Sequence, residues 1–161
     1  MKNYIVKDGD LTKADEVIIC HQVNCKGKMG SGVALAIKNK FPKAYKEYYD
    51  IVQNHKLTST VSGELLGTVQ YVAIEEQGEH TRYIANMFAQ DGYGYRGVYT
   101  SIEAFKKCLE DINKVGVGCN IAFPWKIGCV RGGADWDVVL NLILITLKDV
   151  NNIVFYKLDM E

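Results

Sequence analysis

EVIICHQVNCKGKMGSGVALAIKNKF, residues 16–41, is the stretch that decides the fold. It begins as an apolar strand at residues 17–19 and continues as a polar, glycine-rich loop at residues 21–30. It ends as a helix whose apolar residues Val33, Ile37 and Phe41 recur at i, i+4 and i+8. Glycines let backbone N–H groups approach a ligand, and a helix N-terminus adds unpaired N–H groups. This order predicts a phosphate-binding loop, with a plain strand-to-helix turn as the alternative.

Length and composition fit one domain, residues 1–161, large enough to bury a core without disulfides. Lys plus Arg and Asp plus Glu number 19 each, so the formal net charge is zero and we expect no nucleic-acid or membrane partner. The five cysteines are odd in number, no Cys-x-x-Cys pair occurs, and no signal peptide is evident. We therefore expect reduced thiols, a cytoplasmic location and no zinc site.

Along the rest of the chain, strands and helices alternate. We expect strands at residues 3–7, 120–124 and 153–158, a hairpin at 65–75 and 81–89, and a helix at 42–53, with a surface loop at 55–63. Thr100 with Glu103 resembles a capping box, and Asp135 is a candidate N-cap of the last helix. This alternation predicts a three-layer α/β fold with a mixed, mostly parallel sheet between helices.

Three glycine-containing loops, at residues 21–32, 90–98 and 126–133, each follow a strand and precede a helix. In a wound α/β sheet such loops gather at the carboxyl ends of the strands, where ligands bind. Glycine-rich backbone and helix N-termini suit a pyrophosphate. Tyr93, Tyr95 and Tyr99 on the middle loop are candidates for stacking on a base or sugar, or they are simply surface residues.

Several other chemistries find weaker support in the sequence. Residues 92–97, GYGYRG, match G-x-G-x-x-G, but they lie mid-chain without a following ribose-binding strand, so a dinucleotide oxidoreductase is a weak alternative. Lys28 is followed by Met29, which excludes a Walker loop. Neither Cys25 nor Cys129 has an arginine six residues later, and no Gly-x-Ser-x-Gly occurs, so cysteine phosphatases and serine hydrolases lack their motifs.

Four ordered motifs resemble those of the macro domain family, the ADP-ribose-binding fold: GDLT at residues 9–12, HQVNCKGKMGSGVALAIKNKFP at 21–42, IANMFAQDGYG at 84–94 and FPWKIGCVRGGADW at 123–136. The resemblance covers nearly the whole chain. It is strongest to the branch with the yeast ADP-ribose 1″-phosphate phosphatase and the terminal ADP-ribose protein glycohydrolases. It implies a six-stranded mixed sheet between helices.

The resemblance also implies ligand-binding residues. Asp10, followed by Leu11, matches the aspartate that hydrogen-bonds the adenine amino group, and Asn24 matches the asparagine at the distal ribose. The first phosphate loop corresponds to Gly30, Ser31, Gly32 and Val33, and the second to Gly128, Cys129, Val130, Arg131 and Gly132. Gln22, Gln90 and Tyr93 are further ligand-binding candidates. Neither a cofactor nor a metal is expected.

Catalytic candidates are His21, Asn24 and Asp91. His21 matches a histidine implicated in the yeast-like phosphatases, and Asp91 would activate water or hold His21. The alternatives are a structural histidine, an asparagine that satisfies loop backbone, and a turn aspartate. The chain departs from the glycohydrolase branch at Gln90, near the family's covalent lysine, and at Gly132, about where that branch has an aspartate. Both departures favour attack by water.

The function expected from this resemblance is hydrolysis at the 1″ position of ADP-ribose derivatives. The partner is ADP-ribose or its 1″-phosphate, with ADP-ribosylated protein as a further candidate substrate. A non-catalytic ADP-ribose reader is the alternative. Gln90 in place of lysine favours the reader, whereas His21 and Asp91 favour the enzyme.

Overall fold

A six-stranded sheet forms the centre of the molecule, with strand order β1-β6-β5-β2-β4-β3. The computed structural model describes residues 2–58, 65–77, 80–94 and 97–158. The strands are β1 (Tyr4–Asp8), β2 (Ile18–Asn24), β3 (Val69–Gln77), β4 (His80–Gln90), β5 (Asn120–Pro124) and β6 (Asn152–Lys157). Neighbouring strands are parallel except β3 and β4, which form an antiparallel pair. The predicted mixed, mostly parallel sheet and its hairpin are confirmed.

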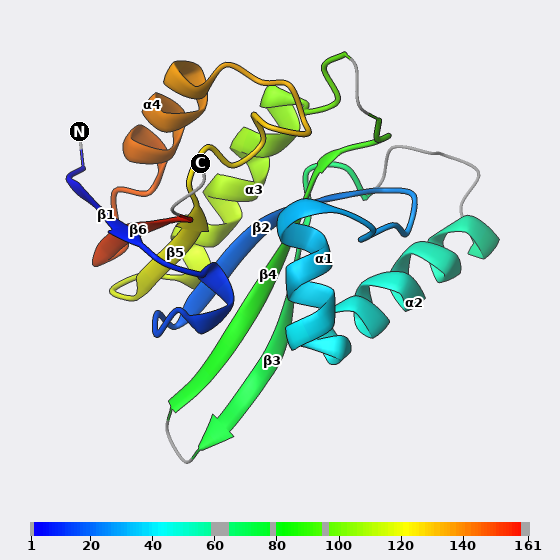
Figure 1. The fold of residues 1–161 in the computed structure, drawn as a ribbon, viewed down its shortest axis with the longest axis horizontal. Coiled ribbons are helices and arrows are strands. Elements are labelled where there is room, and N and C mark those ends of the chain that lie inside the picture. The colour runs from blue at the N-terminus through cyan, green and yellow to red at the C-terminus, as the bar shows by residue number, and fades with distance from the viewer. Residues whose placement is uncertain (1, 59–64, 78–79, 95–96, 159–161) are drawn as a thin grey trace.

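Two helices cover each face of the sheet (Figure 1). On one face lie α1 (Gly32–Lys40) and α2 (Pro42–Thr58), and on the other α3 (Ile102–Val115) and α4 (Trp136–Thr146). A short 3-10 helix, η1 (Leu11–Lys13), follows β1. The largest core cluster lies between the sheet and α3 and α4, and two smaller clusters lie beneath α1 and α2. This is the three-layer α/β arrangement that the sequence predicts.

The alternation of side chains along β2 decides which site residues face which helices. Ile18 and Cys20 pack in the cluster beneath α3 and α4, whereas Ile19 packs in a cluster beneath α1. Successive side chains of a strand point to opposite faces. His21 and Gln22 therefore lie on opposite sides of the sheet.

Four sequence-based boundaries are wrong. The first strand of the hairpin begins at Val69 and not at residue 65. β2 extends to Asn24 because its parallel pairing with β4 continues to that residue, so residues 21–24 belong to a strand and not to a loop. α2 continues to Thr58, so residues 55–58 are helical, and the rest of the predicted loop, 59–63, lies outside the described residues. The N-cap of α3 is Ser101, whose side chain accepts from the Ala104 N–H, and not Thr100. Asp135 is confirmed as the N-cap of α4.

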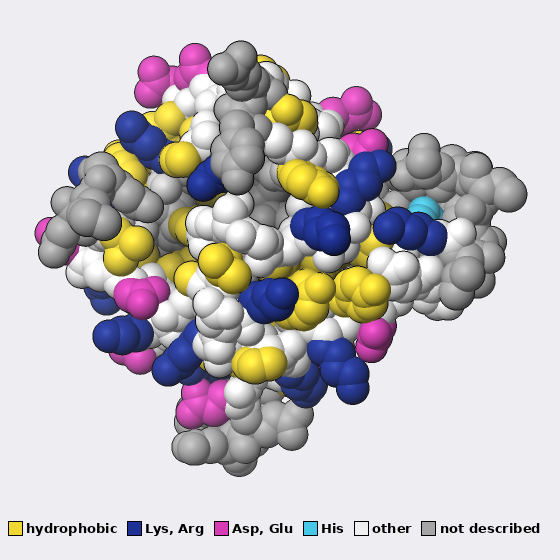
Figure 2. Space-filling view, turned by 45° about the vertical axis from the view of Figure 1, so that its right-hand side comes forward, with side chains coloured by type: hydrophobic (Ala, Val, Ile, Leu, Met, Phe, Trp, Pro, Cys, Tyr) yellow, Lys and Arg dark blue, Asp and Glu magenta, His cyan; other side chains and the backbone are white. Residues whose placement is uncertain are grey.

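Charged side chains are dispersed on the face of the molecule that Figure 2 shows. On the face seen in Figure 2, Lys and Arg side chains lie scattered among apolar and uncharged ones, with Asp and Glu between them. This distribution agrees with the equal numbers of cationic and anionic residues. Over the described ranges, every helix is too short or too polar to cross a bilayer.

Candidate functional site

Four connecting segments meet at one edge of the sheet. Because β1, β2, β4 and β5 run parallel, the segments that follow them, beginning at residues 9, 25, 91 and 125, emerge at their common carboxyl edge (Figure 1). This is the edge at which ligands bind in open α/β sheets. The three glycine-containing loops of the sequence analysis thus lie at the same edge, together with the segment that carries Asp10.

Asn24 shapes the loop that leaves β2. Its Oδ1 accepts from the N–H groups of Lys26 and Lys28 at 3.0 and 3.3 Å, and its Nδ2 donates to the Lys28 carbonyl at 2.9 Å. The Tyr48 hydroxyl lies 2.8 Å from Oδ1 and accepts from the Gly27 N–H at 3.0 Å. Asn24 is therefore buried and satisfied by its own loop and α2, which matches the alternative structural interpretation of this residue.

The N-terminus of α1 presents backbone donors. Ser31 is its N-cap but makes no side-chain capping hydrogen bond, and its first turn holds no acidic residue. A β-carbon added to Gly30 or Gly32 would have no atom of the described residues within 4 Å, and Gly32 has φ +58°, a conformation that favours glycine. The first N–H groups of the helix, at Gly32, Val33 and Ala34, have no intrahelical acceptor, and the space beside Gly30 and Gly32 is open among the described residues.

Asp10 lies between β1 and η1, beside Leu11. Its Oδ1 accepts from the Thr12 N–H at 2.9 Å and from the Thr12 hydroxyl at 2.8 Å, so Asp10 caps η1. Leu11 is buried against the cluster that includes Ile37 of α1. The predicted adenine-binding aspartate is therefore held next to α1 by local hydrogen bonds to one of its two carboxylate oxygens.

The loop of residues 126–133, called the second glycine loop below, is a series of tight turns. Cys129 N–H donates to the Lys126 carbonyl, Gly133 N–H to the Cys129 carbonyl, and Ala134 N–H to the Gly128 carbonyl. Lys126 has φ +59° and Gly128 φ +78°, so the backbone adopts left-handed conformations at both residues. The N–H groups of Val130 and Gly132 are not paired with any acceptor in the described part of the chain. Val130 and Arg131 are exposed at its tip.

Gln22 and Gln90 contact each other and the second glycine loop. Gln22 Nε2 donates to Gln90 Oε1 and to Thr100 Oγ1, both at 2.7 Å, and Thr100 Oγ1 donates to the Gly128 carbonyl at 2.8 Å. Gln90 Nε2 donates to the Gly92 carbonyl at 2.7 Å. Gln90, near which the family resemblance places the lysine of the glycohydrolase branch, is thus buried and engaged in hydrogen bonds.

His21 lies in the middle of β2 beneath α2, with only 1% of its surface exposed. Its Nε2 is 2.5 Å from Asn86 Oδ1, and Asn86 Nδ2 donates to the Ala44 carbonyl and to Gln70 Oε1. Because the Ala44 carbonyl only accepts, Asn86 Oδ1 must face His21, so the proton of the neutral ring is on Nε2 and Nδ1 is bare. Nδ1 is buried and has no hydrogen-bond partner among the described residues.

Burial lowers the pKa of His21 from 6.5 to about 4, and the Asn86 hydrogen bond offsets part of this shift. The ring is therefore neutral at pH 7. A neutral, buried imidazole has no proton to spare for a general acid, and its Nδ1 has no path to solvent in this conformation. The geometry fits a residue that joins β2, β4 and α2.

Asp91 and Tyr93 lie on the exposed middle loop. The Asp91 carboxylate is 3.5 Å from Lys26 Nζ, and both side chains are about half exposed, at 56% and 48%. The Asp91 carbonyl accepts from the Cys25 N–H, which joins the first and middle loops. Tyr93 is exposed, Tyr99 is half-buried beside Gly94, and Tyr95 lies outside the described residues.

The two proposed catalytic side chains are not brought into contact. No hydrogen bond or ion pair joins His21 and Asp91, both of which the structure describes. Thr100 resembles a helix cap in the sequence, and neither its role here nor the buried partners Tyr48 and Asn86 were predicted. Asn86 carries a detectable signal, since it is a polar residue within the apolar strand IANMF.

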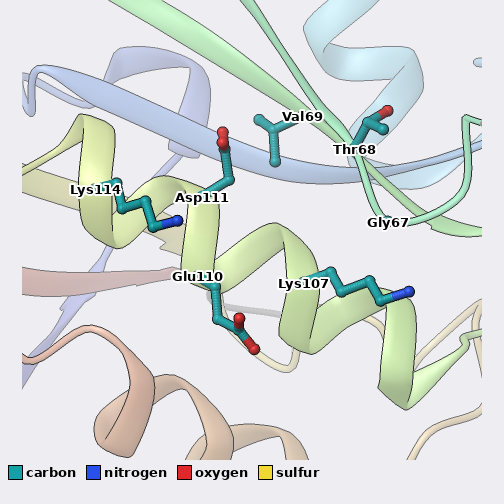
Figure 3. Close-up of a pocket in the computed structure, with 7 residues that line it drawn as sticks. All are labelled: Gly67, Thr68, Val69, Lys107, Glu110, Asp111 and Lys114. Carbon is teal, nitrogen blue, oxygen red and sulfur yellow. The ribbon is translucent and has the colours of Figure 1, made fainter.

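A pocket of about 320 Å³ lies elsewhere, between α3 and the segment that enters β3 (Figure 3). It is lined by Gly67, Thr68, Val69, Lys107, Glu110, Asp111 and Lys114. Its charged side chains extend from one helix, and none of the predicted site residues lines it. The arrangement of backbone donors that suits a pyrophosphate occurs at the glycine loops and not in this pocket.

Comparison with known proteins agrees with this architecture. The family model of the Macro domain matches residues 20–143. An ADP-ribose 1″-phosphate phosphatase of Meyerozyma guilliermondii is 36% identical over 103 residues, 58% of this chain and 56% of that protein. A DNA ADP-ribosyl glycohydrolase of Mycobacterium bovis is 24% identical over 151 residues, 91% of this chain and 40% of that protein. The chain spans about half the length of the curated relatives it matches.

The fold is also that of solved macrodomains. The macrodomain of Mycobacterium tuberculosis DarG superimposes with a TM-score of 0.74 at 25% identity, covering 97% of this chain and 98% of that domain. The shared order of strands and loops, together with the matching family model, leads to one conclusion. The chain belongs to the macro domain family.

Proposed function

We propose that this chain binds ADP-ribose across the segments at the carboxyl edge of its sheet. The observation that carries the proposal is the pair of backbone donor sets at this edge: the open N-terminus of α1 and the turns of residues 126–133. A pyrophosphate held between them would be bound by preorganised N–H groups without a cationic side chain. This suits a protein with no excess of positive charge. The names of the curated relatives point to the same ligand.

The rest of the ligand follows from the order of the segments. Asp10 has a carboxylate oxygen available beyond its bonds to Thr12, and it would accept a hydrogen bond from the adenine amino group. The distal ribose would lie toward the loop shaped by Asn24 and the exposed middle loop with Asp91 and Tyr93. Asn24 would hold that loop in shape through Oδ1, which is already paired, and its Nδ2 keeps a second hydrogen that the bond to the Lys28 carbonyl does not use.

We further propose that the chain hydrolyses a substituent at the 1″ position, either phosphate or an ADP-ribosyl link to protein. Asp91 is the candidate general base, since its carboxylate is exposed on the loop next to the expected distal ribose. His21 would stabilise the packing of β2, β4 and α2 and would not contact the reacting atoms. A mechanism with a covalent lysine has no support. Gln90, near the expected position of that lysine, is a buried glutamine whose amide is hydrogen-bonded, and a side chain at residue 132, about where the aspartate is expected, would collide with Thr100.

The same observations also support a second candidate function, that of a reader that binds ADP-ribose without turnover. Asp91 pairs with Lys26, and His21 is almost fully buried, so the predicted catalytic side chains offer one exposed carboxylate and no acid paired with it. The binding site of a reader and of an enzyme would be the same. The two functions differ only in what happens next to the distal ribose.

Calorimetric titration with ADP-ribose, with AMP and NAD as controls, tests the binding proposal. We expect saturable binding of ADP-ribose and much weaker binding of AMP, which lacks the pyrophosphate and distal ribose. Product analysis with ADP-ribose 1″-phosphate and with ADP-ribosylated protein then decides between enzyme and reader. Release of phosphate or of ADP-ribose that Asp91→Asn abolishes supports the enzyme, and binding without either release supports the reader. Absence of ADP-ribose binding would overturn both.

A further inference from the structure

An unbroken chain of hydrogen bonds connects the middle loop with the second glycine loop. It runs from the Gly92 carbonyl through Gln90, Gln22 and Thr100 to the Gly128 carbonyl, with successive distances of 2.7, 2.7, 2.7 and 2.8 Å. The three side chains come from β4, β2 and the residue before the N-cap of α3. Residues far apart in the sequence are thus joined by side chains in the interior of the carboxyl edge.

The direction of every bond in this chain is determined by chemistry. Both ends are carbonyl oxygens, which only accept, so the Gln90 amide group and the Thr100 hydroxyl must donate to them. Gln90 then offers its oxygen to Gln22, and Thr100 has only a lone pair left for Gln22. Gln22 must therefore donate both of its amide hydrogens. Each donated hydrogen in this series has one acceptor. Removal of one of the three side chains therefore leaves polar groups of its neighbours without a partner.

The second glycine loop packs directly on this chain. A β-carbon on Gly132 would lie 1.9 Å from Thr100 Oγ1 and 2.9 Å from Gln22 Nε2, and one on Gly128 would lie 3.1 Å from Gln22 Oε1. The Gly132 carbonyl accepts from the N–H groups of Tyr99 and Thr100 at 2.7 and 3.0 Å. The backbone of residues 128–132 therefore packs directly against Gln22 and Thr100.

We propose that Gln22, Gln90 and Thr100 are positioning residues that hold the second glycine loop and the middle loop in one binding-competent arrangement. This rests on the proposed binding of ADP-ribose. The three side chains would act through the loop backbone, since their polar atoms, apart from the buried Gln22 Oε1, are used within the chain of hydrogen bonds. Gln22 and Gln90, expected from the sequence to touch the ligand, would support the loops that touch it.

Thr100→Val tests this role, because valine keeps the shape of threonine and removes the hydroxyl. Loss of the hydroxyl leaves the Gly128 carbonyl and one Gln22 hydrogen unpaired, and we expect ADP-ribose affinity to fall about tenfold. Thr100→Ser, which keeps the hydroxyl, should restore near wild-type affinity. Tyr71→Phe is the matched control. It removes a half-buried hydrogen bond to Asp111, at 2.7 Å, in the part of α3 that lines the pocket of Figure 3.

Two further measurements separate a positioning role from a loss of stability. Amide hydrogen exchange of the ligand-free protein should speed up in residues 126–133 and 91–94 together in Thr100→Val, and in neither segment in Tyr71→Phe. The double variant Gln90→Met with Thr100→Val should bind ADP-ribose only slightly more weakly than whichever single variant has the lower affinity. Either substitution alone already interrupts the chain of hydrogen bonds.

These outcomes are distinguishable from failure of the proposed function. If wild-type protein does not bind ADP-ribose, the proposed function fails, and the exchange measurement alone still reports whether the chain of hydrogen bonds couples the loops. If wild-type protein binds and Thr100→Val binds equally well, or if Tyr71→Phe loses as much affinity, the positioning role is overturned. Exchange that increases in only one of the two loops would also contradict it.

Discussion

The Thr100 hydroxyl occupies the space that a side chain on Gly132 would need, since a β-carbon there would lie 1.9 Å from Oγ1. The same β-carbon would lie 2.4 Å from the Gly128 carbonyl oxygen, which belongs to the backbone and moves less easily than a side chain. The second glycine loop therefore tolerates no side chain at this residue. An aspartate of the glycohydrolase type has no room at residue 132.

Gly132→Ala should consequently lower the free energy of unfolding by about 1–3 kcal/mol, the usual effect of overpacking. It should also lower ADP-ribose affinity at least tenfold, because the loop must move away from Thr100. Gly118→Ala is the control. Gly118, unlike Gly132, has a positive φ, of +73°, and no atom of the described residues lies within 4 Å of its β-carbon position. The control should lose some stability through backbone strain and bind ADP-ribose normally. Equal affinities in the two variants would contradict the placement of the loop at the ligand.

Gly30 offers the opposite case, a site glycine with free space around it. No atom lies within 4 Å of its β-carbon position, and its φ is not in the left-handed region. Gly30→Val should therefore change the melting temperature by less than about 2 °C, and affinity for ADP-ribose should fall several-fold because the added methyl groups crowd the approach to the α1 N–H groups. Differential scanning calorimetry measures the melting temperature, and calorimetric titration of the same preparation measures the affinity. An unchanged affinity would remove the first glycine loop from the binding site.

Asp91 and Lys26 allow the carboxylate to be tested apart from its ion pair. Both side chains are about half exposed, so the pair contributes only about 0–1 kcal/mol to stability. If Asp91 is the general base, Asp91→Asn should lower the rate of phosphate release from ADP-ribose 1″-phosphate by about a hundredfold or more, with little change in ADP-ribose affinity. Lys26→Met removes the partner and leaves the carboxylate, so its rate should stay within a few-fold of wild type. If Lys26→Met loses as much activity as Asp91→Asn, Asp91 is not the base.

His21 should make the protein less stable in mild acid. Burial lowers its pKa from 6.5 in the unfolded chain to about 4 in the folded one, so the unfolded state binds the proton more readily between these values. The contribution to stability is complete above pH 6.5 and is lost as the pH falls toward 4. Between pH 7.5 and pH 5 the loss from this residue alone is about 2 kcal/mol.

Denaturant unfolding at several pH values measures this effect. His21→Gln cannot be protonated, and its amide can still pair with Asn86, so its stability should fall less than that of wild type over this range. If both proteins lose the same stability, His21 is not buried as a neutral ring. The pH dependence of phosphate release offers an independent check. A step near pH 4 that His21→Gln removes, without loss of maximal rate, would show that His21 acts through folding and not through proton transfer.

Much of the architecture was predictable from local patterns. The apolar strand NIAFP, the Asp135 cap and the alternating strands and helices depend on neighbouring residues, and the structure has them as expected. The glycine-rich segments after β2 and β5 were visible for the same reason, since turns and helix N-termini need particular residue types at short spacing. The four family motifs located the same segments.

The roles of individual polar residues were not predictable in this way. His21 and Gln22 are neighbours in the sequence, but the pairing of β2 with β4 extends the strand past both. The pleat then sends His21 beneath α2 and Gln22 toward the second glycine loop. Thr100 resembled a helix cap because Glu103 follows at the right spacing. Its hydroxyl is used instead by Gln22 and Gly128, residues 78 and 28 positions away.

The sequence by itself determined the order of elements and the position of the glycine loops, because these follow from periodicity and backbone preference within a few residues. Only the tertiary structure decided that Gln90 is buried and paired, that Gly132 lies against Thr100, and that His21 is a neutral interior residue. Such properties arise from contacts between strands and loops that are distant in sequence. Burial and strand register set them, and neither is encoded in any short stretch of residues.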